Sequence, residues 1–376
     1  MTGSVAMAET YSATGNGYHG EMTVNVTIED GKITDVELGD NHETNVVIDR
    51  AFPVIRERIL EANTADVDSV TAATSSSYAI KTAVADAMQQ AGLEAPKVAM
   101  QNAEKTATER AAESCDIVIV GGGPAGLAAA VSAKQTNADK NVILVEKLDI
   151  LSGNGKFDMN FFDMINTEAQ KAAGNDEWVG EAGLAKFLEE KSSNGESAER
   201  IQVWANEEYN LDAWLRAMGV ELNYNYGGTN HMAEDNQYSG EVIQAGLEKA
   251  AAELGVDVRT GTKGVDLVME DGACKGVIVT NNAGETYTIN AASTIITTGG
   301  FCSNKELLAE YAPGYEVFNT SNQMGTTGDF VKIFEQNGFK MENMGKDRKS
   351  TRLNSSHHGI GYSVLCLKKK KGGGGG

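Results

Sequence analysis

The stretch that decides the fold runs from Cys115 to Glu146 and reads CDIVIVGGGPAGLAAAVSAKQTNADKNVILVE. An apolar strand ends at Val120, a glycine-rich turn follows, an alanine-rich helix runs to about Gln135, and a second strand leads to Glu146. A G-x-G-x-x-G pattern is weak evidence alone. Here it follows a strand, opens a helix and has an acidic residue twenty positions after its last glycine, which together indicate a dinucleotide-binding unit.

The residue types of this turn suit a pyrophosphate. Gly121 permits the tight turn, Gly123 lets the backbone approach the phosphates, and Gly126 lets the helix pack against the strand. A carboxylate at the end of the second strand can accept hydrogen bonds from ribose hydroxyls. We predict that the cofactor contacts comprise Gly121, Gly123, Pro124, Ala125, Gly126 and Glu146. The motif alone leaves NAD and FAD both open.

Two further motifs narrow the choice. Glu146-Lys147 is followed by SGNGK at Ser152–Lys156, and TTGGF occurs at Thr297–Phe301 with Asn304 behind it. Together they resemble the FAD domain of the fumarate reductase and flavocytochrome c family, which includes urocanate reductase and 3-ketosteroid dehydrogenase. The resemblance continues through Asn322–Asp329, and it implies an α/β Rossmann-type FAD-binding domain over residues 115–346. It adds these cofactor-binding residues: Lys147, Gly153, Asn154, Thr298, Gly299, Gly300 and Phe301.

Two stretches inside this domain carry further expectations. Short strands between Gly255 and Ile289 predict a small sheet before the second glycine pair. After the G-N motif the family usually has small residues and paired glycines, whereas Phe157–Asp163 reads FDMNFFD. Bulky Phe161 and Phe162 imply a reshaped pocket or a different substrate, so fumarate itself is not assigned.

The N-terminal residues have a different pattern. Apolar and polar residues alternate from Gly20 to Leu38 around Asp30-Gly31, which predicts a β-hairpin with one buried face. Amphipathic helices are expected over Val47–Ala62 and over Ser77–Ala91. A hairpin followed by two helices predicts an α+β module.

The segment between those helices, Val67–Ser77, reads VDSVTAATSSS. On composition alone it is a Ser/Thr-rich helix cap. It also resembles the attachment motif S/T-G-A-T-x-S/T of the FMN-binding domain family, in which a flavin transferase joins FMN through its phosphate to the last hydroxyl. This resemblance implies an FMN-binding domain over residues 9–93 with covalent FMN on Ser76, Thr71 and Thr74 beside it, and Thr74 or Ser77 as alternative acceptors. Ala72 occupies the glycine position of the motif, which is a departure.

The remaining segments complete the domain plan. Residues 94–114 are rich in Ala, Glu and Lys without apolar periodicity and are interpreted as a linker. Residues 1–8 are a leader or a signal-peptide remnant, because Ala6-Met7-Ala8 has the A-x-A form of a cleavage site. Residues 347–376 resemble a translated sequencing adapter followed by homopolymer, so they are set aside as a non-native tail. The compartment is cytoplasmic as the sequence is written, or extracytoplasmic or membrane-associated if a signal peptide was lost.

Composition limits the function further. A net charge of -21 argues against nucleic-acid binding, and no apolar run reaches the length of a transmembrane helix. The four cysteines show no metal-binding or redox spacing, so isolated thiols in or near the core and no metal site are expected. His231 is interpreted as a surface or loop histidine, and Ser197–Met218 as a packed helix whose tryptophans belong to the core.

The resemblances imply a flavin-dependent reductase in which FMN passes electrons to FAD and FAD delivers a hydride to an activated C=C bond. The expected partners are a small substrate with that bond and a flavin transferase, while the electron donor is unknown. Family members place the catalytic Arg and His after the T-G-D segment, and this chain reaches only Lys346 before the tail. No catalytic residue is therefore assigned, and the chain is expected to be an inactive fragment. The alternatives are a non-enzymatic flavin electron-transfer protein and an NAD-dependent oxidoreductase.

Overall fold

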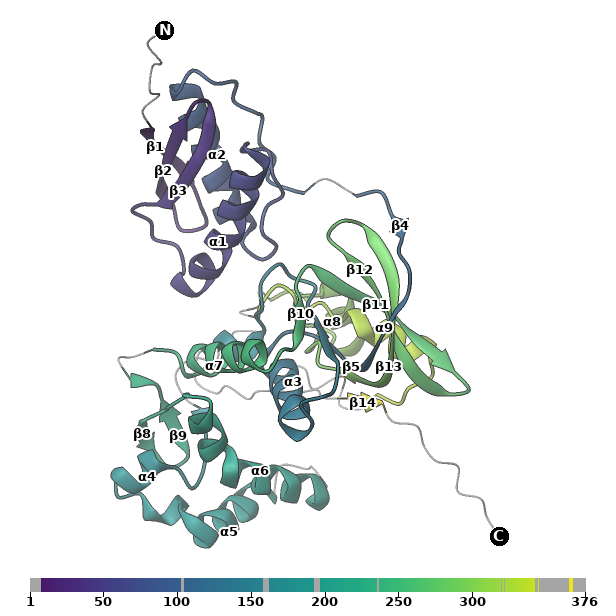
Figure 1. Cartoon of the computed structure of the whole chain (residues 1–376). Coiled ribbons are helices and arrows are strands. Elements are labelled where there is room, and N and C mark those ends of the chain that lie inside the picture. Colours follow the sequence, from purple (N-terminus) through teal and green to yellow (C-terminus); the bar gives the residue numbers. More distant parts are fainter. Residues whose placement is uncertain are drawn as a thin grey trace. The chain divides into compact units, whose positions relative to one another are not determined.

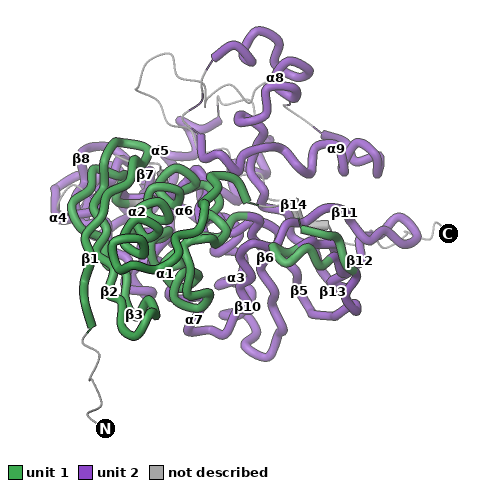
Figure 2. The backbone as a smooth tube through the Cα atoms, turned by 90° about the horizontal axis from the view of Figure 1, so that it is seen from above, with its two compact units in different colours: residues 1–108, 148–150, 281–285 green, residues 109–147, 151–280, 286–376 purple. Residues whose placement is uncertain are grey.

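The chain divides into two compact units (Figure 2). The computed structural model describes residues 8–102, 105–157, 162–192, 197–234, 237–318, 320, 322–341, 344 and 365–367. Unit 1 comprises Met1–Thr108 together with Leu148–Ile150 and Asn281–Glu285, and unit 2 comprises the rest. The finer division into leader, linker and tail stays a prediction.

Unit 1 is a three-stranded antiparallel sheet with two helices (Figure 1). The strands lie in the order β1 (Glu9–Asn16), β2 (Glu21–Glu29) and β3 (Lys32–Leu38), and the helices are α1 (Asn45–Ala62) and α2 (Thr74–Gln90). Alternate β2 residues are buried, because the helices cover one face of the sheet. The predicted hairpin is confirmed, and Asp30 and Gly31 both adopt positive φ, as a two-residue turn requires. Strand β1 was not expected.

Unit 2 is built on one large sheet. Its main path follows the order β10 (Asp257–Arg259), β6 (Val142–Val145), β5 (Glu113–Val120), β13 (Glu285–Ile296), β12 (Ala273–Asn281) and β11 (Thr262–Glu270). Strand β5 is parallel to β6 and β13, and β12 is antiparallel to β13. Strands β4 (Thr108–Glu109) and β14 (Leu365–Leu367) also pair with β13.

The strands predicted between Gly255 and Ile289 are present as β10, β11, β12 and the start of β13, but they belong to the large sheet and do not form a small one. Those strands continue the main sheet, because β13 is long enough to pair with β12 near its start and with β5 over the rest of its length. The loop that closes β5 and the loop that closes β13 therefore leave the same edge of one sheet.

Both faces of this sheet are covered, which explains the unbroken apolar run of β5. On one face, Ile119 and Leu144 pack against α3 (Pro124–Thr136) and α7 (Ser239–Glu253), and these two helices contact each other (Figure 1). On the other face, Val118 and Val120 pack against side chains of β11, β12 and α9 (Asp329–Gln336). Successive residues of β5 thus serve opposite layers.

A smaller group of elements lies between β6 and α7 in the sequence. It contains α4 (Glu168–Ala172), α5 (Gly180–Lys191), α6 (Ala198–Ala217), the 3-10 helices η1 (Asn154–Phe157) and η2 (Asp176–Trp178), and a sheet in the order β7 (Phe162–Asp163), β9 (Asn230–Met232) and β8 (Tyr224–Gly227). The predicted helix at Ser197–Met218 is confirmed as α6. The placement of Trp204 in the core is wrong, because it is 40% exposed and its indole N–H donates to Glu208 at 3.0 Å. Among the described residues, no helix is both long and apolar enough to cross a bilayer.

Candidate functional site

The glycine turn after β5 has space only for glycine at its decisive positions. Gly121 has a φ of 110°, which favours glycine. A Cβ atom on Gly126 would lie 1.9 Å from the carbonyl oxygen of Gly121 and 2.7 Å from Thr297 Oγ1. The first turn of α3 therefore packs directly on the end of β5.

The start of α3 suits an anion. Gly123 is the N-cap residue and Pro124 is at the first helical position, and no side chain among the described residues caps this end. The amides of a first turn have no partner within the helix, and the helix dipole favours negative charge there. A Cβ on Gly123 would lie 3.3 Å from the carbonyl oxygen of Ser152, so the backbone of the SGNG segment borders the same end. These features fit the pyrophosphate of a dinucleotide.

Two side chains hold the turn from outside. Glu146, at the end of β6, is buried, and its Oε2 accepts from the Gly122 amide at 2.7 Å. Gln244 of α7 is fully buried, and its Nε2 donates to the Gly122 carbonyl at 3.3 Å. The sequence predicted Glu146 as a ribose contact, which stays a prediction, and gave no sign of Gln244, because its contact with Gly122 spans the whole helical insertion.

The second glycine pair begins beside the first. The Thr297 amide donates to the Val120 carbonyl at 2.8 Å, and the Thr297 hydroxyl donates to the same oxygen at 2.9 Å. Thr298, Gly299 and Gly300 leave the sheet from this point. The side chain of Phe301 is buried in a cluster with residues of α8 (Lys305–Tyr311), and its carbonyl oxygen accepts from the Asn304 amide at 2.8 Å.

Lys147 is hydrogen-bonded to the T-G-D segment, Thr327–Asp329. Its Nζ donates to Thr327 Oγ1 and Asp329 Oδ2, both at 2.6 Å, and Lys263 lies 2.9 Å from Asp329 Oδ1. Burial alone would raise the pKa of Asp329, but the hydrogen bonds with the two lysines outweigh it and hold that pKa below its ordinary value. Asp329 opens α9, where the helix dipole adds to this effect.

Asn154 links the SGNG motif to the segment before α9. Its Oδ1 accepts from the Gln323 amide at 2.8 Å, and its Nδ2 donates to Asn322 Oδ1. Gly153 has a φ of 114° and approaches Gly123 so closely that a Cβ on Gly153 would lie 2.9 Å from Gly123 Cα. The structure thus brings the three separate motifs of unit 2 to one edge of its sheet.

The hydroxyl-rich segment of unit 1 forms a second helix start. Helix α2 begins at Thr74 and not at Ser77 as expected, so Thr74, Ser75, Ser76 and Ser77 all lie in its first turn. Its N-cap is Ala73, and no side chain within the described part of unit 1 caps it. The helix starts earlier than predicted because its buried face already includes Ser76 and Ser77. The first-turn amides can therefore meet a phosphate here too.

The hydroxyls of this turn have different partners. Ser76 is 3% exposed, and its Oγ donates to Oε2 of Glu43, a residue that the sequence did not single out. Ser77 is fully buried, and its Oγ accepts from the Val70 amide at 3.0 Å. Thr74 is half-buried at the helix start, and Thr71 lies in the turn that precedes it. The Ser77 hydroxyl thus stabilises the backbone before α2, whereas the Ser76 hydroxyl donates to a carboxylate.

Ala72, at the glycine position of the motif, has a left-handed backbone conformation. Its φ is 73°, in the left-handed region that L-residues with a Cβ rarely occupy. The departure noted in the sequence is therefore a strained residue at a position where the backbone turns toward α2.

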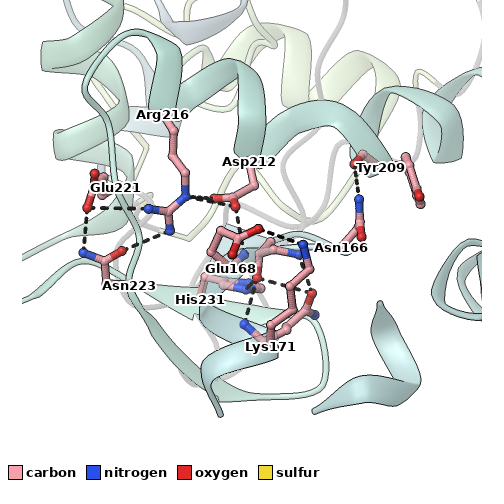
Figure 3. A network of polar contacts seen from close by, with 11 residues as sticks. Asn166, Glu168, Lys171, Tyr209, Asp212, Arg216, Glu221, Asn223 and His231 are labelled. Carbon is pink, nitrogen blue, oxygen red and sulfur yellow. Dashed lines mark hydrogen bonds and ion pairs between the residues drawn. The ribbon is translucent and has the colours of Figure 1, made fainter. Parts of the chain in front are cut away.

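The interpretation of His231 as a surface or loop residue is wrong. It lies in β9 and is fully buried, its Nε2 is 2.6 Å from Thr167 Oγ1, and its Nδ1 is 2.8 Å from the Thr229 carbonyl oxygen. Burial lowers its pKa, so it is neutral at physiological pH. Figure 3 shows it beside a network in which Asp212 accepts from Arg216 and from the Glu168 amide. Both ring nitrogens are thus engaged by residues of the same small group of elements.

The remaining expectations concern thiols, metals and the FDMNFFD stretch. Cys115 and Cys274 are half-buried, Cys302 is buried, and burial raises the pKa of Cys115 to about 11. Within the described ranges no three His, Cys, Asp or Glu side chains gather as a metal site. Phe162 packs against the core on the α3 side of the sheet, whereas Phe161 lies outside the described residues.

Comparison with known proteins gives matches for both units. A family model described as an FAD binding domain matches residues 116–346, and one described as an FMN-binding domain matches residues 17–89. The chain is 31% identical over 335 residues to an NADH:fumarate oxidoreductase of Klebsiella pneumoniae (strain 342), which covers 87% of this chain and 35% of that protein. It is 32% identical over 353 residues to a urocanate reductase of Eggerthella lenta, which covers 90% of this chain and 57% of that protein.

A solved structure agrees with these matches. The open conformation of a flavocytochrome c3 fumarate reductase is 28% identical with a TM-score of 0.54, over 60% of this chain and 40% of that one. The predicted fold class is confirmed, and the choice between NAD and FAD is decided in favour of FAD. The chain spans between 35% and 57% of the length of the two curated relatives.

Proposed function

Since the chain belongs to the FAD binding domain family and carries an FMN-binding domain ahead of it, we propose that it is the flavin-carrying part of a reductase that acts on activated C=C bonds. Electrons enter through an FMN attached to Ser76 and leave through an FAD bound at Gly121–Gly126. Bound FMN supplies an electron relay, and bound FAD supplies a hydride donor.

One observation carries this proposal. Two separate helices, α2 and α3, each begin directly after a motif of small residues, and no side chain in the described parts of the chain caps either start. A first turn without a cap presents its amides to an anion, and small residues let a phosphate come close. One helix start has a hydroxyl for covalent attachment, and the other has a neighbouring carboxylate for ribose. The two sites therefore suit a tethered mononucleotide and a free dinucleotide.

The chain's own residues have distinct roles in this proposal. The backbone of Gly121–Gly126 and of Gly153 holds the pyrophosphate, and Glu146 accepts from the ribose. Lys147 orders the T-G-D segment through Asp329, whose ion pairs are described above. Asn154 and the backbone of Thr298–Phe301 complete the FAD-binding site, since both motifs lie at the same edge of the sheet.

The substrate proposed is a small molecule whose C=C bond is conjugated to an electron-withdrawing group. Relatives named for fumarate and urocanate reduction support this class. Hydride addition to such a bond builds negative charge on the activating group, so cationic or hydrogen-bonding side chains must face it. We assign no described residue to the stabilisation of that charge. Turnover of the substrate is proposed for a longer protein that contains this chain.

The first experiment counts flavins. The chain is produced with a flavin transferase, and then denatured and filtered. We expect FAD in the filtrate and a protein mass raised by one FMN less one water, which peptide mapping places on Ser76. A Ser76→Ala variant should keep the releasable FAD and lose the mass increase. A colourless protein of unmodified mass would overturn the proposal.

The second experiment tests the electron route in a protein that contains the whole of this chain. Oxidation of reduced viologen is followed with fumarate, urocanate and acrylate as acceptors. We expect turnover with at least one acceptor and a large loss in the Ser76→Ala variant. Equal turnover without FMN would show that electrons reach the FAD by another way, and no turnover with any acceptor would favour a pure electron-transfer protein.

A further inference from the structure

Glu43 holds the proposed FMN acceptor by a carboxylate that is itself fixed. The side chain is 8% exposed, and each of its oxygens has a partner in unit 1. Oε2 accepts from the Ser76 hydroxyl, and Oε1 accepts from the His19 amide at 2.8 Å. With both oxygens engaged, the carboxylate cannot rotate away from Ser76.

The surrounding backbone is shaped around this carboxylate. A Cβ atom on Gly17 would lie 2.5 Å from Glu43 Oε1, so a larger residue in the turn between β1 and β2 would have to displace the carboxylate. That turn is closed by a bond from the Gly17 amide to the Gly20 carbonyl at 2.7 Å. Ahead of α1, the Glu43 amide donates to Asn41 Oδ1 at 3.1 Å. Three chain segments thus meet at one buried acid.

We propose that Glu43 is the general base of FMN attachment, taking the proton of the Ser76 hydroxyl as its oxygen attacks the flavin phosphate. This inference rests on the proposed attachment at Ser76. A serine hydroxyl is a weak nucleophile unless a neighbouring base removes its proton. A carboxylate within hydrogen-bonding reach of that hydroxyl is the geometry that such a step requires.

The step balances without a redox change. The donor is a flavin dinucleotide, in which the FMN phosphorus is joined to a second phosphate. The bond from Ser76 Oγ to that phosphorus forms, the bond from the phosphorus to the bridging oxygen breaks, and a nucleoside monophosphate leaves. The hydroxyl proton passes to Glu43 Oε2. A carboxyl that has become neutral no longer repels the phosphodiester beside it.

The same contact selects the acceptor within the hydroxyl cluster. Ser77 uses its oxygen to accept from the Val70 amide, so its lone pairs are directed into the fold. Ser76 is a donor to an acid, which leaves its oxygen lone pairs for attack. Because Ser76 and Glu43 are both nearly buried, bulk water competes little for the proton that passes between them.

The test measures the rate of labelling. The purified chain is mixed with a flavin transferase and FAD, and intact mass is followed over time from acid to alkaline pH. Glu43→Gln preserves size and keeps one acceptor oxygen for the His19 amide, but its amide group cannot take a proton from Ser76, so we expect labelling to slow by about 100-fold or more. Glu43→Asp should retain part of the rate.

Two controls separate chemistry from folding. Hydrogen exchange of α2 should be the same in wild type and Glu43→Gln. In Glu43→Ala, added formate should restore labelling, which a merely structural role would not allow. Wild-type rates and an unchanged pH profile in Glu43→Gln would overturn the role of Glu43 while leaving attachment intact. A wild-type chain that never gains mass at Ser76 would overturn the attachment itself.

Discussion

Replacing Ala72 with glycine should stabilise unit 1. Ala72 has a φ of 73°, and the left-handed conformation costs a residue with a Cβ roughly 1–2 kcal/mol. Glycine removes that cost but gives the unfolded chain more freedom, which costs about 0.4–1 kcal/mol. The first effect is the larger one. We therefore expect a net gain of about 0.5–1 kcal/mol in the free energy of unfolding.

The assay must report unit 1 alone. All three tryptophans lie in unit 2, so indole fluorescence does not follow unit 1. Hydrogen exchange of α2 peptides, read by mass spectrometry in the full chain, is the direct measure, and slow amides of Ala72→Gly should exchange about two- to fivefold more slowly.

Ala73→Gly is the matched control. Ala73 is the adjacent residue and has an ordinary φ of -128°, so glycine there relieves no strain, adds the entropic loss, removes a buried methyl group and should accelerate exchange. The reasoning is refuted if the two variants shift exchange in the same direction.

Three further predictions concern unit 2. Gly126→Ala places a Cβ 1.9 Å from the Gly121 oxygen, so we expect a loss of about 1–3 kcal/mol in urea unfolding and less releasable FAD. Burial raises the pKa of Glu208 from its ordinary 4.5 to about 7, so wild-type stability should fall as pH rises from 4.5 to 7. The loss is about 3 kcal/mol, and Glu208→Gln should abolish it in unfolding followed by Trp fluorescence. Asp329→Asn should cost about 1–2 kcal/mol at pH 7, and the difference from wild type should shrink as the pH falls below the ordinary carboxyl pKa of 3.8 and through the lowered pKa of the folded state, because the carboxylate is then protonated in both states.

The local parts of the fold were predictable from the sequence. The strand, turn and helix around Gly121–Gly126 depend on neighbouring residues, and the bounds of β5, α3 and β6 agree with expectation within two residues. The hairpin of β2 and β3 was equally visible. Strand β1 was not, because Ala13 is its one fully buried apolar side chain and the strand shows no apolar alternation.

Contacts between residues far apart in the chain could not be predicted from the sequence. Glu43 meets Ser76 across 33 residues, and Gln244 meets the Gly122 carbonyl across 122. His231 was misread for the same reason, since Thr167 and Thr229 satisfy its ring only after β9 has been placed in its sheet. Trp204 was misread because polar Glu208 and Asp212 occupy the buried stripe of α6 in place of apolar residues.

The long strand β13 has a consequence for how this protein can diversify. Strand β13 pairs with β5, and the Thr297 hydroxyl donates hydrogen bonds to the carbonyls of Val120 and Gly121. These contacts hold the two glycine turns in a fixed position relative to each other. The residues from α4 to β9 are inserted between those fastened strands without interrupting them. Such an insertion can become longer or shorter, or change its surface, while the two glycine turns keep their geometry.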